Sequence, residues 1–186
     1  MLVDNKKIIF IHCPRTGGTS MEAALRSWLS SSSLEKKINK YKHLTIEKYK
    51  KALGDEFKRY WSFAFVRNPW DMQLSLYCQT GHSGDRFDLW LNRNKRSSSR
   101  SYQGRRHHNQ LNYISLNGRT IVDYVGRYET LHEDWKYISS KLNITEDLPH
   151  LNKTNSCHYR QYYNAKSKGI VAKLFSKDIE HFGYSY

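Results

Sequence analysis

The sequence predicts an α/β domain of three layers, with a short, mainly parallel β-sheet flanked by helices. Two segments support this prediction, because each gives an apolar strand, a turn and then a helix. Apolar, β-branched residues run without interruption through 8–11, which is typical of a strand buried on both faces. Trp61–Val66 is a second such run, and Asn68-Pro69 ends it before helical spacing begins at Trp70. Because the same order occurs twice, we expect both strands to lie in one parallel sheet.

The remaining elements are expected in chain order around these two units. After the first strand, Thr19 or Ser20 is predicted to cap a helix that runs from residue 21 to about residue 29. The other expected elements are a loop at 30–33, a helix at 45–53, a helix at 70–79, a strand at 122–128, and helices at 131–142 and 165–181. Neither internal repeats nor a linker occur, so residues 1–186 are predicted to form one domain with a very basic loop or lid at about 93–108.

Composition restricts the class of protein and suggests the charge of its partner. Hydrophobic residues make up only 38%, but 14% are aromatic, and aromatic side chains bury enough area each to predict a folded core. Lys and Arg number 31 against 17 Asp and Glu, giving a formal net charge of +14. Such an excess predicts an anionic partner, and nucleic acid, anionic lipid, acidic polysaccharide and a phosphorylated cofactor all qualify.

The cysteines and the N-terminal residues suggest a cellular compartment. Cys13, Cys78 and Cys157 are odd in number and far apart, which predicts neither a disulfide framework nor a metal-binding pair. The sequence shows no signal peptide and no apolar stretch of the ~20 residues that a membrane helix needs. We therefore expect a cytoplasmic protein without membrane insertion; the alternative is a luminal catalytic domain of a longer chain, which would have the same features.

A glycine-rich segment between the first strand and its helix is suited to binding an anion. It reads His12-Cys13-Pro14-Arg15-Thr16-Gly17-Gly18-Thr19-Ser20. Backbone N–H groups at a helix start carry partial positive charge, glycines allow close approach, and Arg15 and the hydroxyls add donors. The alternative is an ordinary glycine turn before a capped helix. The segment is not a Walker A loop, because its basic residue precedes the glycines and no lysine follows them.

A second candidate for phosphate binding follows the second strand. Arg67 can form a forked pair with a phosphate, and Ser75 can donate from the next helix. The alternative is that Arg67 pairs with a local carboxylate such as Asp71 and that Ser75 has no role.

The two segments together resemble the donor-binding motifs of sulfotransferases that use 3'-phosphoadenosine 5'-phosphosulfate (PAPS). Residues 14–20 resemble the 5'-phosphosulfate loop, P-K-T-G-G-T-S, and residues 67–77 resemble the 3'-phosphate motif, R-[ND]-P-x-x-x-x-x-S-x-Y. The resemblance implies a P-loop-like fold, PAPS as donor, 3'-phosphoadenosine 5'-phosphate (PAP) as product, and no metal. The residues that it implies for donor binding are Arg15, Thr16, Gly17, Gly18, Thr19, Ser20, Arg67, Ser75, Lys153 and Thr154.

Further segments resemble small carbohydrate-type sulfotransferases and extend the similarity over nearly the whole chain. They include Gln110, residues 123–129, 148–154 and 159–163, and the ending Phe182-Gly183-Tyr184. This resemblance implies in-line transfer to a hydroxyl acceptor, preferably of a carbohydrate. The basic segment 93–108 suggests that the carbohydrate is acidic and is bound by Arg105, Arg106, His107 and His108.

The resemblance also implies catalytic residues. His43, in Tyr41-Lys42-His43-Leu44-Thr45, is similar to the histidine base of glycan 2-O-sulfotransferases, with His107 and His108 as rivals. Arg15 stands where many members have lysine. Because arginine effectively never gives up its proton, we expect Arg15 to stabilise charge rather than to donate a proton.

Two other classes of function remain open from the sequence. A basic nucleic-acid-binding module would use the positive charge and the many tyrosines, but no helix-turn-helix, zinc or aromatic RNA-binding motif is present. A nucleotide-binding protein of the same fold without catalysis is the second alternative. Loss of activity in His43→Ala with retained donor binding would distinguish the enzyme from this alternative.

Overall fold

A computed structural model of the chain describes residues 1–79, 86–94, 109–145, 147–149 and 158–186. The chain divides into two compact units, each formed from two stretches of sequence. The first unit comprises Met1–Val66 and Asn112–Asn152, and the second comprises Arg67–Leu111 and Lys153–Tyr186. That the whole chain acts as one domain stays a prediction.

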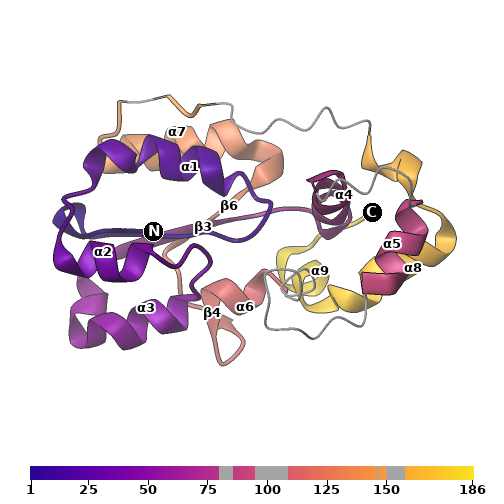
Figure 1. Cartoon of the computed structure of the whole chain (residues 1–186), viewed down its shortest axis with the longest axis horizontal. Helices are drawn as coiled ribbons and strands as arrows, with labels where there is room; N and C mark the ends of the chain where they lie inside the picture. Colours follow the sequence, from indigo (N-terminus) through magenta and orange to yellow (C-terminus); the bar gives the residue numbers. More distant parts are fainter. Residues whose placement is uncertain (80–85, 95–108, 146, 150–157) are drawn as a thin grey trace. The chain divides into compact units, whose positions relative to one another are not determined.

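The first unit contains a four-stranded, mainly parallel sheet (Figure 1). Its order is β1 (Leu2–Val3), β2 (Ile8–Ile11), β3 (Trp61–Val66) and β6 (Tyr124–Arg127). β2 pairs with β3, and β3 with β6, in parallel, whereas β1 pairs with β2 antiparallel. The three predicted strands are therefore confirmed, and so is the α/β class.

Helices cover both faces of this sheet. Figure 1 shows α1 (Gly18–Ala24) and α7 (Leu131–Leu142) on one side of the strands and α2 (Ser33–Asn39) and α3 (Ile46–Leu53) on the other. Strand residues facing α1 and α7 form a core with helix residues, comprising Phe10, Phe63, Phe65, Met21, Leu25, Trp135 and Ile138. Because side chains alternate along a strand, the equally buried Ile9 and Ile11 point to the opposite face.

Short elements complete the first unit. They are η1 (Asp4–Lys6), η2 (Arg26–Trp28), η3 (Gly54–Arg59), η5 (Tyr128–Thr130), and the antiparallel pair β4 (Ser115–Leu116) and β5 (Arg119–Thr120). α6 (Leu111–Ile114) begins at the last residue of the second unit's first stretch.

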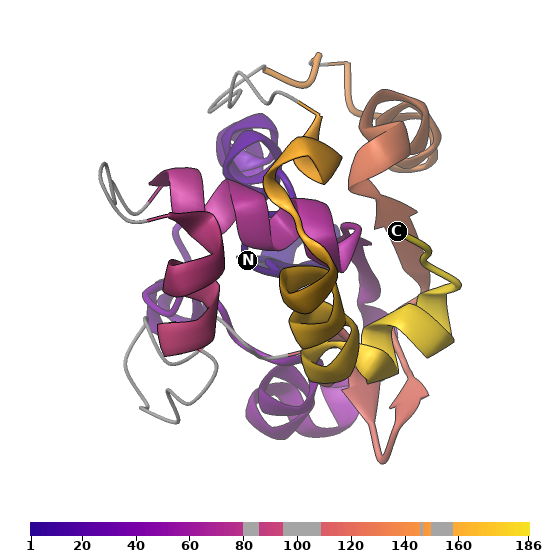
Figure 2. The same ribbon diagram turned by 90° about the vertical axis from the view of Figure 1, so that its right-hand side faces the viewer.

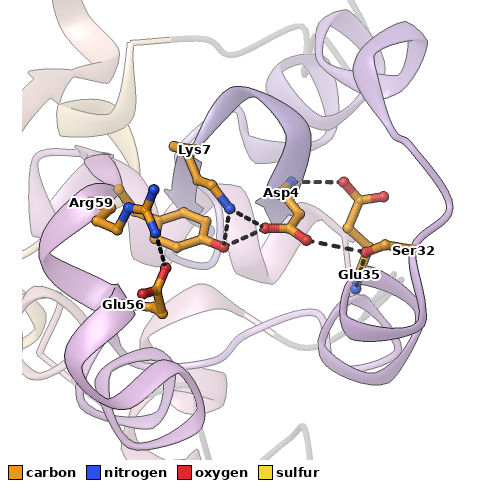
Figure 3. Close-up of polar contacts among 7 residues, drawn as sticks. Asp4, Lys7, Ser32, Glu35, Glu56 and Arg59 are labelled. Atoms are coloured by element: carbon orange, nitrogen blue, oxygen red, sulfur yellow. Dashed lines mark hydrogen bonds and ion pairs between the residues drawn. The ribbon is translucent and has the colours of Figure 1, made fainter.

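A polar network fixes the N-terminal strand pair of the first unit to α2 and η3 (Figure 3). The Asp4 carboxylate accepts hydrogen bonds from Lys7 Nζ (2.9 Å), from the Tyr60 hydroxyl, and from Ser32 Oγ (3.4 Å). The backbone N–H of Asp4 donates to Glu35 Oε1 at 2.7 Å. The hydrogen bonds from Tyr60 and Lys7 lower the pKa of Asp4, so the carboxylate is ionised at neutral pH.

The second unit is helical in its described part. α4 (Pro69–Gln79), α5 (Phe87–Asn94) and α8 (Ala165–Leu174) pack against one another, and η6 (Tyr159–Tyr162) and α9 (Ser176–Phe182) adjoin them (Figure 2). Their shared core includes Trp70, Leu74, Phe87, Trp90, Val171 and Phe175. Throughout the described residues, no helix is long and apolar enough to cross a membrane.

Four sequence expectations about the helices need correction. The N-cap of α1 is Gly17 rather than Thr19 or Ser20, and α1 ends at Ala24 instead of continuing to residue 29. The loop expected at 30–33 ends in a helix start, because Ser32 Oγ accepts from Glu35 N and caps α2. The single helix expected at 165–181 breaks at the fully buried Phe175, whose φ of −113° and ψ of 25° interrupt the helix. α5 was not expected at all.

Candidate active site

The glycine-rich segment of the first unit connects the end of β2 to the start of α1. Gly17 has a φ of 81° and Arg15 a φ of 66°, so the chain passes twice through the left-handed region. Glycine adopts that region without cost, whereas for arginine it is a strained conformation of the kind found at functional sites. The buried Thr16 hydroxyl donates to the Cys13 carbonyl at 2.9 Å and thereby closes the turn. In this structure the Thr16 hydroxyl thus holds the shape of the loop.

Glycine is required at position 18 because the His12 ring lies too close to leave room for a Cβ. A Cβ built at Gly18 would lie 2.1 Å from His12 Cδ2, far inside van der Waals contact. The imidazole of His12 is therefore packed directly against the first turn of α1. Only 5% of His12 is exposed.

His12 also joins α1 to the segment that carries His43. Its Nδ1 lies 2.7 Å from Glu22 Oε1, and its backbone carbonyl accepts a hydrogen bond from His43 Nδ1 at 2.9 Å. The two imidazoles meet edge to face with their centroids 4.6 Å apart. Lys42 Nζ lies 3.8 Å from the other oxygen of Glu22. The predicted base and the glycine loop are thus parts of one cluster within the first unit.

The protonation states in this cluster follow from burial and hydrogen bonding. Burial lowers the pKa of His43 to about 4, and although the bond to the His12 carbonyl opposes this, the imidazole is neutral at pH 7. A carbonyl can only accept, so Nδ1 of His43 carries the proton and Nε2 carries the lone pair. Burial likewise lowers the pKa of His12. Burial is the largest influence on Glu22 and would raise its pKa, but the hydrogen bond from His12 and the charges of His12, Lys42 and the N-terminus together lower the net pKa.

In the second unit, Arg67 is the first residue after β3 and is almost completely buried. Its Nε donates to Asp71 Oδ2 at 2.8 Å, which is the local ion pair considered as an alternative from the sequence. The ion pair through Nε helps to fix the orientation of the guanidinium.

A frame of amide and carboxylate bonds holds the backbone of Arg67. Gln110 Oε1 accepts from Arg67 N at 2.8 Å, and Gln110 Nε2 donates to the Arg67 carbonyl at 2.9 Å. The fully buried Asp178 accepts from the backbone N–H groups of Gln110 (2.7 Å) and Leu111 (2.9 Å). Burial raises the pKa of Asp178, although these hydrogen bonds oppose the rise. The position of Arg67 therefore depends on two residues distant in sequence.

Ser75 lies within α4, whose start is capped by the residue after Arg67. Asn68 Oδ1 accepts from Trp70 N at 3.0 Å, and the Asn68 carbonyl accepts from Met72 N at 2.8 Å. Ser75 is 3% exposed. Arg67, Asn68 and Ser75 thus belong to one continuous segment of the second unit, and hydrogen bonds fix its start.

Comparison with known protein families decides the class of this chain. A model of the sulfotransferase family matches residues 1–185. The chain belongs to the sulfotransferase family. No curated protein matches the chain significantly. The family membership agrees with the fold and supports an enzyme that transfers a sulfuryl group.

Several residues predicted for this sulfotransferase lie outside the described residues. They are Lys153 and Thr154 for the donor, and Arg105, Arg106, His107 and His108 for the acceptor. Among the residues that are described, no group of three His, Cys, Asp or Glu side chains is placed to hold a metal ion.

Four residues of the sulfotransferase were not assigned a role from the sequence, namely His12, Glu22, Gln110 and Asp178. His12 was quoted only as a neighbour of the loop, and Gln110 only as part of the resemblance. Glu22 follows Gly18 by one helical turn, so its direction toward the loop could have been anticipated from helix periodicity. The sequence carries no signal that would pair Asp178 with Gln110, since 68 residues separate them.

Proposed function

We propose that this sulfotransferase moves a sulfuryl group from PAPS to a hydroxyl of a carbohydrate and releases PAP. The observation that supports this most strongly is the neutral His43 imidazole hydrogen-bonded to the residue that opens the glycine loop. In a chain that belongs to the sulfotransferase family, this gives a base next to an anion-binding turn. The carbohydrate acceptor rests on the sequence resemblance to glycan enzymes.

Donor binding is proposed for two sets of residues. Arg15, Gly17, Gly18, Thr19 and Ser20 would bind the 5'-phosphosulfate through N–H groups, hydroxyls and the Arg15 guanidinium. Thr16, whose hydroxyl is engaged with Cys13, would contribute its backbone N–H.

The other set would bind the 3'-phosphate, and its members Lys153 and Thr154 would close over the donor phosphates. Arg67 and Ser75 are assigned to the 3'-phosphate, and Lys153 and Thr154 to the phosphates more generally. For Arg67 and Ser75, the hydrogen bonds that hold Arg67 and the start of α4 in place support this role.

The chemistry follows from the state of His43. Its Nε2 lone pair accepts the proton of the acceptor hydroxyl as the new oxygen–sulfur bond forms. The bond between sulfur and the bridging phosphate oxygen breaks, and its electron pair remains on PAP. Arg15 stabilises the negative charge on the transferring group and on the leaving oxygen. PAP is a good leaving group, so the reaction needs neither a proton donor nor a metal at this oxygen.

Incubation with ³⁵S-labelled PAPS and a panel of hydroxyl-bearing sugars tests the proposal. We expect label on at least one sugar with wild type, and a loss of roughly 10²–10⁴-fold in His43→Ala, the usual contribution of a general base. His181→Ala, a change at an exposed histidine of the second unit, is the matched control. Undiminished transfer by His43→Ala would contradict the role of His43 as the base. Absence of transfer from PAPS to any hydroxyl would contradict the proposed function.

Two parts of the account stay predictions from the sequence alone. The cytoplasmic location rests on the few, widely spaced cysteines. Recognition of an acidic acceptor by residues 105–108 rests on their charge.

A further inference from the structure

A small pocket lies beside α1 in the first unit, next to the His12–Glu22–His43 cluster. Its volume is about 230 Å³, and its lining includes Glu22, Arg26 and Leu29 from α1 and the segment after it, with Tyr41 and Lys42 from the segment before α3. Sites for drug-sized ligands usually measure roughly 300–1,000 Å³. This pocket therefore suits a single sugar-sized ring rather than a whole nucleotide.

The lining combines cations with an exposed aromatic ring. Arg26 is exposed, and among the described residues no hydrogen-bond or ion-pair partner is found for its guanidinium. The Lys42 side chain is 54% exposed, and its one ion pair with a described residue is a long 3.8 Å contact with Glu22, a surface pair of the kind that contributes little. Tyr41 is also 54% exposed, and Lys40 Nζ lies 4.9 Å from the centroid of its ring. Two available cations beside an aromatic surface are suited to a ring that carries an anionic group.

The position of the pocket connects it to the reaction. Lys42 immediately precedes His43, and Glu22 lines the pocket with the same side chain whose Oε1 lies 2.7 Å from His12. The His12 ring in turn contacts the His43 ring at 4.6 Å between centroids. A ligand in the pocket would lie next to the residues that fix the base.

We propose that this pocket binds the acceptor and selects an acidic sugar, whose anionic group pairs with Arg26 and Lys42 while its ring lies against Tyr41. The inference rests on the proposed function for the identity of the ligand as an acceptor. It adds a specificity site formed by described residues, none of which belongs to the basic segment 93–108.

Direct binding in the presence of saturating PAP tests the proposal without requiring turnover. The probes are a uronic-acid-containing tetrasaccharide and the same tetrasaccharide with its carboxyl groups reduced to alcohols, titrated calorimetrically. The proteins are wild type, Arg26→Gln, Arg26→Lys, and the control Lys51→Gln, which removes one exposed charge on α3 outside the pocket. Thermal melts establish that all four are folded.

We expect wild type to bind the acidic probe more tightly than the reduced one. Arg26→Gln should weaken binding of the acidic probe about tenfold, the effect of losing one charge-assisted hydrogen bond, and should leave binding of the reduced probe unchanged. Arg26→Lys should retain most of the affinity, and Lys51→Gln should match wild type.

Other results overturn the proposal. They are equal weakening of both probes in Arg26→Gln, the same loss in Lys51→Gln, no binding to wild type, or no preference for the acidic probe. Labelled transfer from PAPS separates this inference from the proposed function. Selective binding of the acidic probe without labelled transfer would support the pocket and contradict the proposed enzyme. Labelled transfer by wild type, with binding of the acidic probe unchanged in Arg26→Gln, would support the enzyme and contradict the pocket.

Discussion

At the scale of single residues, the state of His43 is set by its neighbours. Its pKa is lowered to about 4, mainly by burial and also by the charges of His12 and Lys42, whereas the bond to the His12 carbonyl and the charge of Glu22 oppose the lowering. The proposed base must be unprotonated, so the low pKa would keep His43 in its active form through the whole neutral range.

The pH dependence of kcat/KM should report this pKa. Because the neutral imidazole is the active form, kcat/KM should be level from pH 8 down to about pH 5 and should fall only as the pH approaches the His43 pKa. Glu22→Gln should shift this acid limb to lower pH, and Lys42→Gln should shift it to higher pH, since the two charges act in opposite directions. An acid limb centred between pH 6 and 7 in wild type, unmoved by both variants, would contradict this account of the base.

Gly18 should tolerate no side chain while His12 is present. Gly18→Ala places a methyl group 2.1 Å from the His12 ring, so we expect it to lower the free energy of unfolding by roughly 1–3 kcal/mol, as overpacking does, and to weaken PAP binding. His12→Ala removes the obstructing ring, so the added cost of Gly18→Ala should largely vanish in the double variant. Urea unfolding of the four proteins measures the coupling, and equal costs in both backgrounds would show that the ring is not the cause.

Little of this residue-level arrangement could be predicted from the sequence. The glycine loop and Arg67 follow from chemistry and spacing, but His43 could be chosen among nine histidines only through a family resemblance. Its contact with His12 joins residues 31 apart, and such a contact depends on how the segment before α3 returns to the sheet.

At the scale of elements, Gln110 and Asp178 hold the start of α4 in place. Gln110 makes two hydrogen bonds to the backbone of Arg67, and Asp178 accepts the N–H groups of Gln110 and Leu111. This frame joins the start of α6 and α9 to the residue that follows β3.

Asp178→Asn should loosen the frame with little change in size. An amide has one oxygen in place of two acceptors, so at least one buried N–H loses its partner, which costs roughly 1–3 kcal/mol of unfolding free energy. Because the affected groups support Arg67, PAP affinity should fall as well. Asp88→Asn, at a solvent-exposed ion pair of the same unit, is the control. A stability loss in Asp178→Asn with wild-type PAP affinity would restrict Asp178 to folding.

Elements with a strong sequence pattern were predicted well, whereas elements with a weak pattern were not. β2, β3 and α7 have the expected bounds, because continuous apolar runs and helical spacing specify them. β1, β4 and β5 have two residues each, too few for any pattern. The break at Phe175 depends on burying that side chain in the core of the second unit, which is a tertiary effect.

At the scale of the whole molecule, the positive net charge and the family membership both favour anionic substrates. The net charge of +14 predicted an anionic partner, and PAPS with an acidic sugar would supply anions at both substrates. The family match does not decide the acceptor or the catalytic base, but it favours an enzyme over a nucleic-acid-binding module.

The central claim is that this sulfotransferase binds a 3',5'-phosphorylated adenosine without metal. Calorimetric titration of wild type and Arg67→Lys with PAP, and separately with ATP and magnesium, tests it most directly. Arg67→Lys keeps the charge beside Asp71 but removes the guanidinium fork. We predict metal-free binding of PAP, tighter than ATP with magnesium, and weakened at least tenfold in Arg67→Lys. Absence of PAP binding, or equal affinity for PAP and ATP in both proteins, would contradict the account.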